Sequence, residues 1–247
     1  MSIFIANWKA NPENYKEALS FAKDFKKTSF PKAAKVVICP PAFFLQGLHA
    51  VLPRVSFGVQ DISRYEAGAR TGEVTAKMAK TGGAEYVIIG HSERRTLGET
   101  NETVGIKIKN ALKAGLTPIV CIGESERDMD GLFYNNLRDD LHECLEGVPK
   151  NSVKNIILAY EPKWAIGTEG KVIEAEDLSE AVMFLQKVLT DIAGEGAKKT
   201  KIIYGGSVDA KNIRTLAIPG VSGFLVGRAS LTVKKFADLI KKASEKS

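Results

Sequence analysis

The chain has 247 residues, of which 44% are hydrophobic and 26% are charged, with a net charge of +6 at pH 7. This composition is typical of a folded globular protein, and the length suits one α/β barrel or two smaller domains. No apolar run approaches the ~20 residues of a membrane-spanning helix, and the N-terminus has neither a basic nor a long apolar leader region. We therefore expect an intracellular, cytoplasmic protein with no membrane partner.

The excess positive charge lies mainly in lysine pairs near the expected ends of helices, and cations in a last turn complement the helix dipole. The pairs are Lys26-Lys27, Lys198-Lys199, Lys234-Lys235 and Lys241-Lys242. They are not interleaved with aromatic residues and no zinc-finger spacing is present, so a solvated surface is favoured over a nucleic-acid interface. Cys39, Cys121 and Cys144 are odd in number and lack metal-ligand spacing, which predicts reduced thiols and no zinc site.

Short apolar runs alternate with amphipathic stretches along the whole chain. The runs predict buried strands at residues 3–6, 35–39, 55–59, 86–89, 118–122, 156–160, 201–204 and 223–226. The first amphipathic stretch predicts a helix with Pro12 in its first turn and one apolar face: Tyr15, Ala18, Leu19, Ala22 and Phe25. The clearest apolar stripe runs over 178–192 and is closed by Gly194 and Gly196. A last helix is predicted over 233–243, with Phe236, Leu239 and Ile240 facing inward.

Eight strands, each followed by a helix and with no linker-like segment between them, favour a single closed (β/α)8 barrel over residues 1–247. An open, doubly wound sheet is the alternative fold. That fold predicts a Gly-x-Gly-x-x-Gly fingerprint after an early strand, and no such motif opens a helix here.

Candidate catalytic residues follow three of the predicted strands, at the C-terminal ends where such barrels carry their active sites. Glu161 is placed to act as a base, and Lys9 to supply a fixed positive charge. His91 opens a polar turn, where a helix N-terminus favours the uncharged imidazole that donates a hydrogen bond to a carbonyl or enediolate oxygen. In the alternative interpretation Glu161 is a solvated strand end, His91 a helix cap and Lys9 a surface lysine.

Two glycine-rich turns, at 204–208 and 223–228, follow the seventh and eighth strands. Glycine allows backbone N–H groups to approach an anion closely, and a following helix N-terminus adds a favourable dipole. Either turn alone is more often just a tight turn. Because these two loops are the usual phosphate seat of the fold, the pair together favours phosphate binding.

Together these motifs resemble the triosephosphate isomerase family, in register from the first strand to the last. The matching segments are Asn7-Trp8-Lys9, His91-Ser92-Glu93-Arg94-Arg95, 159–162 with 164–168, 204–207 and 223–227. The resemblance implies the TIM-barrel fold and the interconversion of dihydroxyacetone phosphate and D-glyceraldehyde 3-phosphate, a step of glycolysis and gluconeogenesis. It also implies that no metal or organic cofactor takes part.

The resemblance further implies residue roles. Glu161 is the expected catalytic base, His91 the neutral electrophile, Lys9 the electrostatic stabiliser and Glu93 a second carboxylate of the active site. The residues expected to contact substrate are Asn7 and Lys9, with Gly167, Ser207, Gly227 and Arg228 at the phosphate through backbone N–H groups. Family members are usually homodimers and sometimes tetramers. Residues 66–73 match the loop, with Thr71 at its tip, that inserts beside the neighbour's active site.

Four positions depart from the family pattern, and none of them removes a reacting group. Asp61 stands where asparagine is usual, which places a negative charge near the expected dimer contact. Lys163 replaces an apolar residue in the first hinge of the lid, and Glu169 reads as a one-residue insertion within the lid. Arg228 replaces the second glycine of the phosphate loop and keeps that position's N–H, although it favours negative φ more strongly than glycine does.

Two other functions stay open on the sequence alone. A non-catalytic phosphosugar-binding scaffold on the same barrel predicts the loss of a reacting side chain, whereas Lys9, His91 and Glu161 are all present. A barrel isomerase or lyase acting on a larger phosphosugar needs a roomier site and is expected to lack the short lid motif at 164–168.

Overall fold

The computed structural model describes residues 2–128, 130–166 and 172–245 of the chain. Its strands are β1 (Ser2–Asn7), β2 (Ala34–Cys39), β3 (Ser56–Val59), β4 (Tyr86–Ile89), β5 (Thr117–Ile122), β6 (Ile157–Tyr160), β7 (Lys201–Tyr204) and β8 (Val221–Val226). They run parallel and close into a barrel in sequence order, because β1 pairs with both β2 and β8. The predicted (β/α)8 barrel is confirmed, and the predicted strand ends differ from those observed by one or two residues at most.

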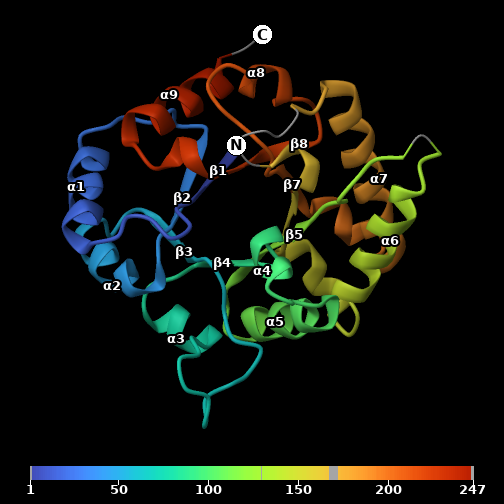
Figure 1. Ribbon diagram of the computed structural model, residues 1–247, viewed down its shortest axis with the longest axis horizontal. Helices are drawn as coiled ribbons and strands as arrows, with labels where there is room; N and C mark the ends of the chain where they lie inside the picture. The colour runs from blue at the N-terminus through green and yellow to red at the C-terminus, as the bar shows by residue number, and fades with distance from the viewer. Residues whose placement is uncertain (1, 129, 167–171, 246–247) are drawn as a thin grey trace.

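Helices lie around the barrel, as Figure 1 shows in a view along it. They are α1 (Tyr15–Lys26), α2 (Ala42–Val51), α3 (Ala76–Thr81), α4 (Ser92–Thr96), α5 (Asn101–Lys113), α6 (Phe133–Cys144), α7 (Ala175–Ala193), α8 (Ile213–Leu216) and α9 (Val233–Ser244). Short 3-10 helices occur at η1 (Lys150–Asn155), η2 (Lys163–Ala165), η3 (Glu195–Lys199) and η4 (Arg228–Ser230). Within the described segments, no helix combines the length and the apolar character needed to cross a bilayer.

The start of α1 differs from the prediction. Its N-cap is Asn14, whose side chain accepts a backbone hydrogen bond from the first turn, so Pro12 lies before the helix instead of in its first turn. The buried face also differs, because the Trp8 ring at the end of β1 takes Phe21 as an edge-on partner with the ring centroids 4.6 Å apart. Tyr15, which the stripe predicted to be buried, is 39% exposed.

The later helices follow their predictions more closely. The α7 stripe packs Leu178, Leu185 and Leu189 into the core, and Gly194 ends that helix with φ of +77°. Gly196 does not close α7, because it lies beyond Gly194, within η3. The inward residues predicted for the last helix are buried as expected.

Alternation along each strand separates two apolar cores and also builds the mouth of the barrel. In β1, Ile3 and Ile5 fill the barrel interior, whereas Phe4 packs outward against the helices. The same two-residue step continues to Asn7 at the end of β1. In β6 the interior residues Ile157 and Ala159 lead in the same way to Glu161, so the strand period itself turns this carboxylate toward the mouth.

The three cysteines are free and buried. Burial raises the pKa of Cys39 and of Cys121, and it raises the pKa of Cys144 to about 11. All three are therefore thiols at neutral pH, in agreement with the reduced state predicted from their number and spacing.

Candidate active site

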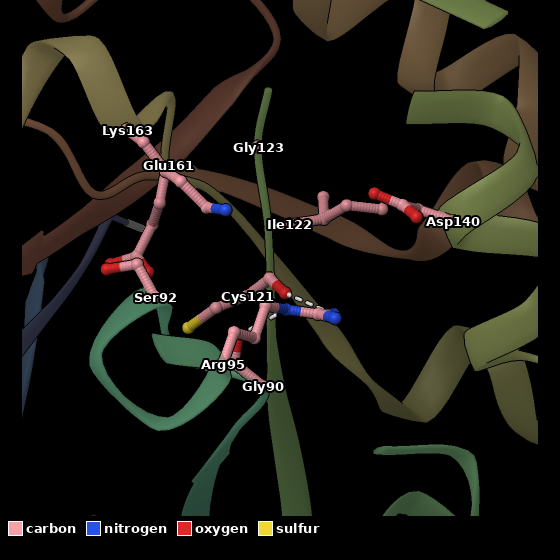
Figure 2. A pocket seen from close by; sticks show the side chains of 9 residues that line it. All are labelled: Gly90, Ser92, Arg95, Cys121, Ile122, Gly123, Asp140, Glu161 and Lys163. Carbon is pink, nitrogen blue, oxygen red and sulfur yellow. Dashed lines mark hydrogen bonds between the residues drawn. The ribbon is translucent and has the colours of Figure 1, made fainter. Parts of the chain in front are cut away.

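Glu161 is a buried acidic residue at the mouth of the barrel, with 3% of its surface exposed. Its backbone N–H donates to the Ile122 carbonyl at 2.7 Å, which extends the strand pairing by one residue and fixes where the side chain begins. Burial raises the pKa of Glu161, and the neighbouring His91, Cys121 and Lys9 oppose that rise. Figure 2 shows the carboxylate beside Ser92. A desolvated carboxylate with a raised pKa is a suitable proton acceptor near neutral pH.

Gly205 provides the space that the Glu161 side chain occupies. A Cβ at Gly205 would lie 2.6 Å from Glu161 Cγ and 2.7 Å from Oε1, closer than any real contact allows. The two residues meet because Tyr160 and Tyr204 pair in the β6–β7 register, which places the next residue of each strand side by side. The sequence indicated only an anion-binding or tight-turn role for this glycine, so this function was missed.

His91 caps α4, and its ring is oriented by that helix. The Nδ1 atom accepts a hydrogen bond from the Glu93 N–H at 3.2 Å, so the hydrogen-bond pattern assigns the single proton of a neutral imidazole to Nε2. Nε2 lies 3.8 Å from Glu161 Oε1, and the His91 side chain is 7% exposed. The residue is therefore a helix cap, as one interpretation of the sequence held, and its Nε2 also lies close to the carboxylate, without a hydrogen bond between them.

Lys9 has φ of +53°, and among the described residues it is the only non-glycine residue with a positive φ. Two side chains hold this backbone: Asn7 Oδ1 accepts from the Lys9 N–H at 3.1 Å, and Gln60 Nε2 donates to the Lys9 carbonyl at 2.8 Å. Such a conformation costs roughly 1–3 kcal/mol and persists where the surroundings enforce it, commonly at functional sites. Lys9 Nζ pairs with Glu93 Oε1 at 2.5 Å.

The structure thus brings Lys9, His91, Glu93 and Glu161 into one cluster, although they come from three different strand ends. Glu93 is the link, because its Oε1 pairs with the Lys9 ammonium and its N–H donates to His91 Nδ1. A base, a hydrogen-bond donor and a cation in one place can together remove a carbon-bound proton and stabilise the oxyanion that results. In the described part of the chain, no three His, Cys, Asp or Glu residues are grouped so as to hold a metal ion.

The predicted phosphate seat lies partly within the described residues. A Cβ at Gly227 would lie 3.6 Å from Lys9 Cε, so the turn after β8 borders the cluster. Arg228 begins η4 and is absent from the residues with positive φ, so its backbone does not require glycine. The Ser207 N–H donates to the Ala165 carbonyl at 2.9 Å, a hydrogen bond that the sequence did not indicate. Gly167, Thr168 and Glu169 lie outside the described residues.

The Glu124 carboxylate holds Trp164, the first residue of the lid motif expected at 164–168. The sequence did not indicate this role for Glu124. Glu124 Oε1 accepts hydrogen bonds from Trp164 Nε1 at 2.9 Å, from the Tyr160 hydroxyl at 2.9 Å and from Arg127 Nε at 3.1 Å. The only sequence signal was its position at the end of the fifth strand. Lys163, the departure in this hinge, is exposed and its Nζ donates to Ser125 Oγ at 3.2 Å.

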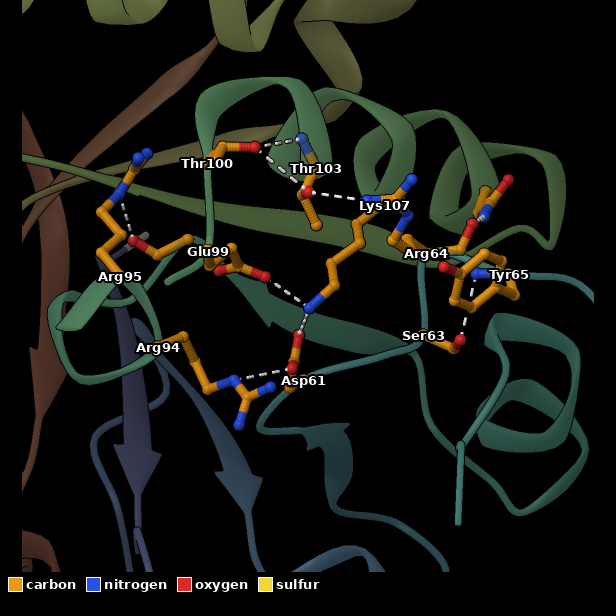
Figure 3. Close-up of polar contacts among 12 residues, drawn as sticks. Asp61, Ser63, Arg64, Tyr65, Arg94, Arg95, Glu99, Thr100, Thr103 and Lys107 are labelled. Atoms are coloured by element: carbon orange, nitrogen blue, oxygen red, sulfur yellow. Dashed lines mark hydrogen bonds and ion pairs between the residues drawn. The ribbon is translucent and has the colours of Figure 1, made fainter. Parts of the chain in front are cut away.

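Asp61, the departure expected to place a negative charge near the dimer contact, belongs to an ion-pair network (Figure 3). Its carboxylate pairs with Arg94 Nε at 2.9 Å and with Lys107 Nζ at 2.6 Å. Lys107, whose side chain is 6% exposed, also pairs with Glu99. The network holds two cations and two carboxylates, so the charge of Asp61 is balanced within the chain.

Comparisons with known proteins agree with this geometry. Residues 2–243 match the family described as triosephosphate isomerase. The chain is 39% identical over 245 residues to the triosephosphate isomerase of Alkaliphilus oremlandii, covering 96% of this chain and 98% of the relative. It is 40% identical to those of Dehalococcoides mccartyi, over 98% of this chain and 96% of the relative, and Clostridium botulinum, over 97% and 98%. A barrel closed in the expected order and full-length similarity at this level lead to one conclusion: the chain belongs to the triosephosphate isomerase family.

Proposed function

We propose that Glu161, His91 and Lys9 carry out the reaction for which the family is named, the interconversion of dihydroxyacetone phosphate and D-glyceraldehyde 3-phosphate. Glu161 removes a proton from the carbon beside the carbonyl and returns it to the neighbouring carbon. His91 Nε2–H donates a hydrogen bond to the substrate oxygens. The Lys9 ammonium stabilises the negative charge of the enediolate that forms between the two proton transfers.

One observation carries this proposal: the buried Glu161 carboxylate lies 3.8 Å from His91 Nε2, the nitrogen that the hydrogen-bond pattern leaves as a donor. A proton acceptor and a neutral donor this close can act on adjacent atoms of one small substrate. The alternative interpretation, in which these residues are a strand end and a cap only, gives no reason for burying an acid next to an oriented imidazole.

The substrate phosphate is proposed to bind backbone N–H groups of Ser207, Gly227 and Arg228, with Gly167 completing the seat from outside the described residues. The contact between Gly227 and Lys9 supports this, because it puts the turn after β8 beside the cluster. The Ser207 N–H donates to the Ala165 carbonyl. Phosphate binding is therefore expected to exchange this neutral acceptor for a charged one, which forms the stronger hydrogen bond.

The protein is further proposed to act as a homodimer, in which the 66–73 loop of one subunit inserts beside the cluster of the other. Residues 64–73 are all exposed, and a hydrogen bond from the Ser63 N–H to the Val74 carbonyl at 2.8 Å closes the base of the loop. Figure 1 shows the segment between β3 and α3 extending away from the body. Phe43 in α2 is 93% exposed, and Met78 in α3, the helix that directly follows the loop, is 53% exposed, which is apolar surface suited to burial against a second copy.

The test is a coupled assay that offers the purified protein triose phosphates and, separately, pentose phosphates. We expect turnover of triose phosphates only, with competitive inhibition by phosphoglycolate, which resembles the enediolate. Glu161→Asp withdraws the carboxylate by about one methylene, and a displacement near 1 Å is expected to lower kcat by ~10²-fold. Binding of phosphoglycolate without turnover would favour the scaffold, and turnover of pentose phosphates would favour the larger-sugar enzyme.

A further inference from the structure

A pocket borders Glu161 on a side other than the one that faces His91 and Lys9. It is a pocket of about 230 Å³ that Glu161 lines but neither His91 nor Lys9 does. Figure 2 shows the Glu161 carboxylate and Ser92 on one side of it and Arg95 and Asp140 on the other. The pocket therefore extends from the candidate base toward α6, away from the residues proposed to hold the substrate oxygens.

The pocket connects a buried acid to the protein surface. Glu161 is 3% exposed, whereas Lys163 in its wall is exposed and Ser92 and Asp140 are partly exposed. The volume exceeds that of several water molecules, at ~30 Å³ each, and a polar wall of this kind supplies the hydrogen-bond partners that buried water requires. The Glu161 Oε2 atom is buried and lacks a partner among the described protein groups, so a carboxylate oxygen here is available to a water-borne proton.

We propose that this pocket is the route by which the proton held by Glu161 exchanges with solvent while a substrate occupies the cluster. The inference rests on the proposed function. After Glu161 has broken the substrate C–H bond and taken its proton, the O–H proton either forms the new C–H bond at the neighbouring carbon or passes to a water in the pocket. In the second case, a solvent proton reprotonates Glu161 through the same water and is then delivered to carbon.

The two fates of the proton separate in space, which is why the pocket can control one without the other. Transfer to carbon needs the His91 and Lys9 side of Glu161, where the enediolate is held. Exchange needs the Ser92 and Asp140 side, whose lining includes none of the residues proposed to bind the substrate. The width of the pocket is therefore expected to set the share of exchange with little dependence on the rate of proton abstraction.

Ile122 offers a means of changing that width. Its side chain is 2% exposed, and Figure 2 shows it extending from β5 toward Asp140. Ile122→Phe narrows the pocket and Ile122→Val widens it, and neither change introduces a polar or charged group. Ile157→Val is the matched control, because Ile157 is a buried isoleucine of the barrel interior that does not line the pocket.

The experiment converts dihydroxyacetone phosphate in D2O with the full-length chain, stops at low conversion and measures by NMR the deuterium at the newly protonated carbon. The ratio of deuterated to undeuterated product reports exchange against direct transfer, so a general loss of activity cancels. We expect Ile122→Phe to lower this ratio about twofold or more, Ile122→Val to raise it, and Ile157→Val to match the parent.

An unchanged ratio in both Ile122 variants would overturn the inference, as would an equal change in the Ile157 control. If Ile122→Phe does not fold, Ile122→Val still provides the test. A ratio of deuterated to undeuterated product equal to that of the parent would contradict the proposed route. Failure of the proposed function is distinct: the parent would then form no product from dihydroxyacetone phosphate in H2O or in D2O.

Discussion

At the scale of single residues, the site places a buried carboxylate, whose burial lowers the stability of the fold, beside Gly205, which leaves space for it. Glu161 is buried with one carboxylate oxygen unpartnered among the described groups, an arrangement that opposes stability. Lys9 adds a strained backbone, held by Asn7 and Gln60. Strain and buried charge at the same place as three candidate catalytic groups are typical of a functional site.

Gly205→Ala tests whether the space beside the carboxylate positions it. The new Cβ would lie 2.6 Å from Glu161 Cγ, so the side chain must shift, and we expect kcat to fall by ~10²-fold with a smaller change in KM. Gly196→Ala is the control, because Gly196 has open space around it and no positive φ. Steady-state kinetics on both variants provide the measurement. Equal activity of the two would show that Gly205 does not place the base.

The Glu161→Gln variant tests how much the buried acid lowers the free energy of unfolding, because that effect depends on pH. Because burial raises the pKa of Glu161, its contribution to stability is fully present below the unfolded pKa of about 4.3 and is lost as pH rises through the raised folded pKa. The glutamine variant does not titrate here. We expect it to be more stable than the parent by roughly 1–3 kcal/mol near pH 8, with a difference that fades toward about pH 4.

Urea unfolding of the parent and of the Glu161→Gln variant, at several pH values, measures this difference. The variant is expected to lose isomerase activity while it gains stability, the usual trade-off at a site that needs a buried charge. A constant difference at every pH would mean that Glu161 titrates alike in the folded and unfolded chains.

The sequence was sufficient to predict that the candidate catalytic groups lie at one face of the barrel, but not what surrounds them. Lys9, His91 and Glu161 were predicted because each polar residue follows an apolar run, and the strand ends of a parallel barrel meet at one face. Gly205 and Glu124 were not assigned their roles. One depends on the β6–β7 register and the other on hydrogen bonds among three loops, and neither leaves a local pattern in the chain. The role of each site residue stays a prediction until it is tested by mutation.

At the scale of elements, the strands were easier to predict than the helix ends. A strand buried on both faces leaves a continuous apolar run, which is hard to mistake. The start of α1 was wrong because Asn14 takes the cap, and its apolar face was incomplete because Phe21 is recruited by the Trp8 ring. That residues 1–247 form one domain also stays a prediction.

The ion-pair network of Asp61, Arg94, Glu99 and Lys107 connects elements that the barrel alone would not join. It links the segment after β3 to α4, to the turn before α5 and to α5 itself (Figure 3). Because α4 begins directly after His91, the network supports the helix that orients the imidazole. We therefore expect Asp61 to support the cluster through α4.

Lys107→Met tests the network. The change leaves Asp61 and Glu99 without their shared cation, and loss of one partner from a buried pair is expected to cost about 3–5 kcal/mol of unfolding free energy. Lys198→Met is the control, because Lys198 and Glu195 form an exposed pair outside the proposed dimer loop and such pairs contribute little. Denaturant unfolding at pH 7 measures both. Similar losses in the two variants would mean that the network is not a buried support.

At the scale of the whole molecule, the proposed assembly depends on surface that no sequence pattern identified. Residues 66–73 were assigned to a dimer contact only through the family resemblance, because an exposed glycine-bearing loop is equally well a solvated one. The structure adds Met78, which is apolar, exposed and lies in α3, the helix that directly follows that loop. Isolated exposed apolar residues are normal, and Met78 supports an interface here only because of its position after the loop.

Met78→Asp and Met183→Asp form a matched pair that tests this assembly. The two methionines are 53% and 62% exposed, so the same substitution creates a similar charge at a similarly accessible place. Met78 lies in α3, next to the extended loop, whereas Met183 lies in α7 on another side of the barrel (Figure 1). A buried unpaired charge at an interface costs ~2–5 kcal/mol, which weakens association by at least about tenfold. We therefore expect sedimentation at low micromolar concentration to show a dimer for the parent and for Met183→Asp, and monomers for Met78→Asp with reduced turnover. A parent that sediments as a fully active monomer would overturn the dimer, and the 66–73 loop would then be a solvated one.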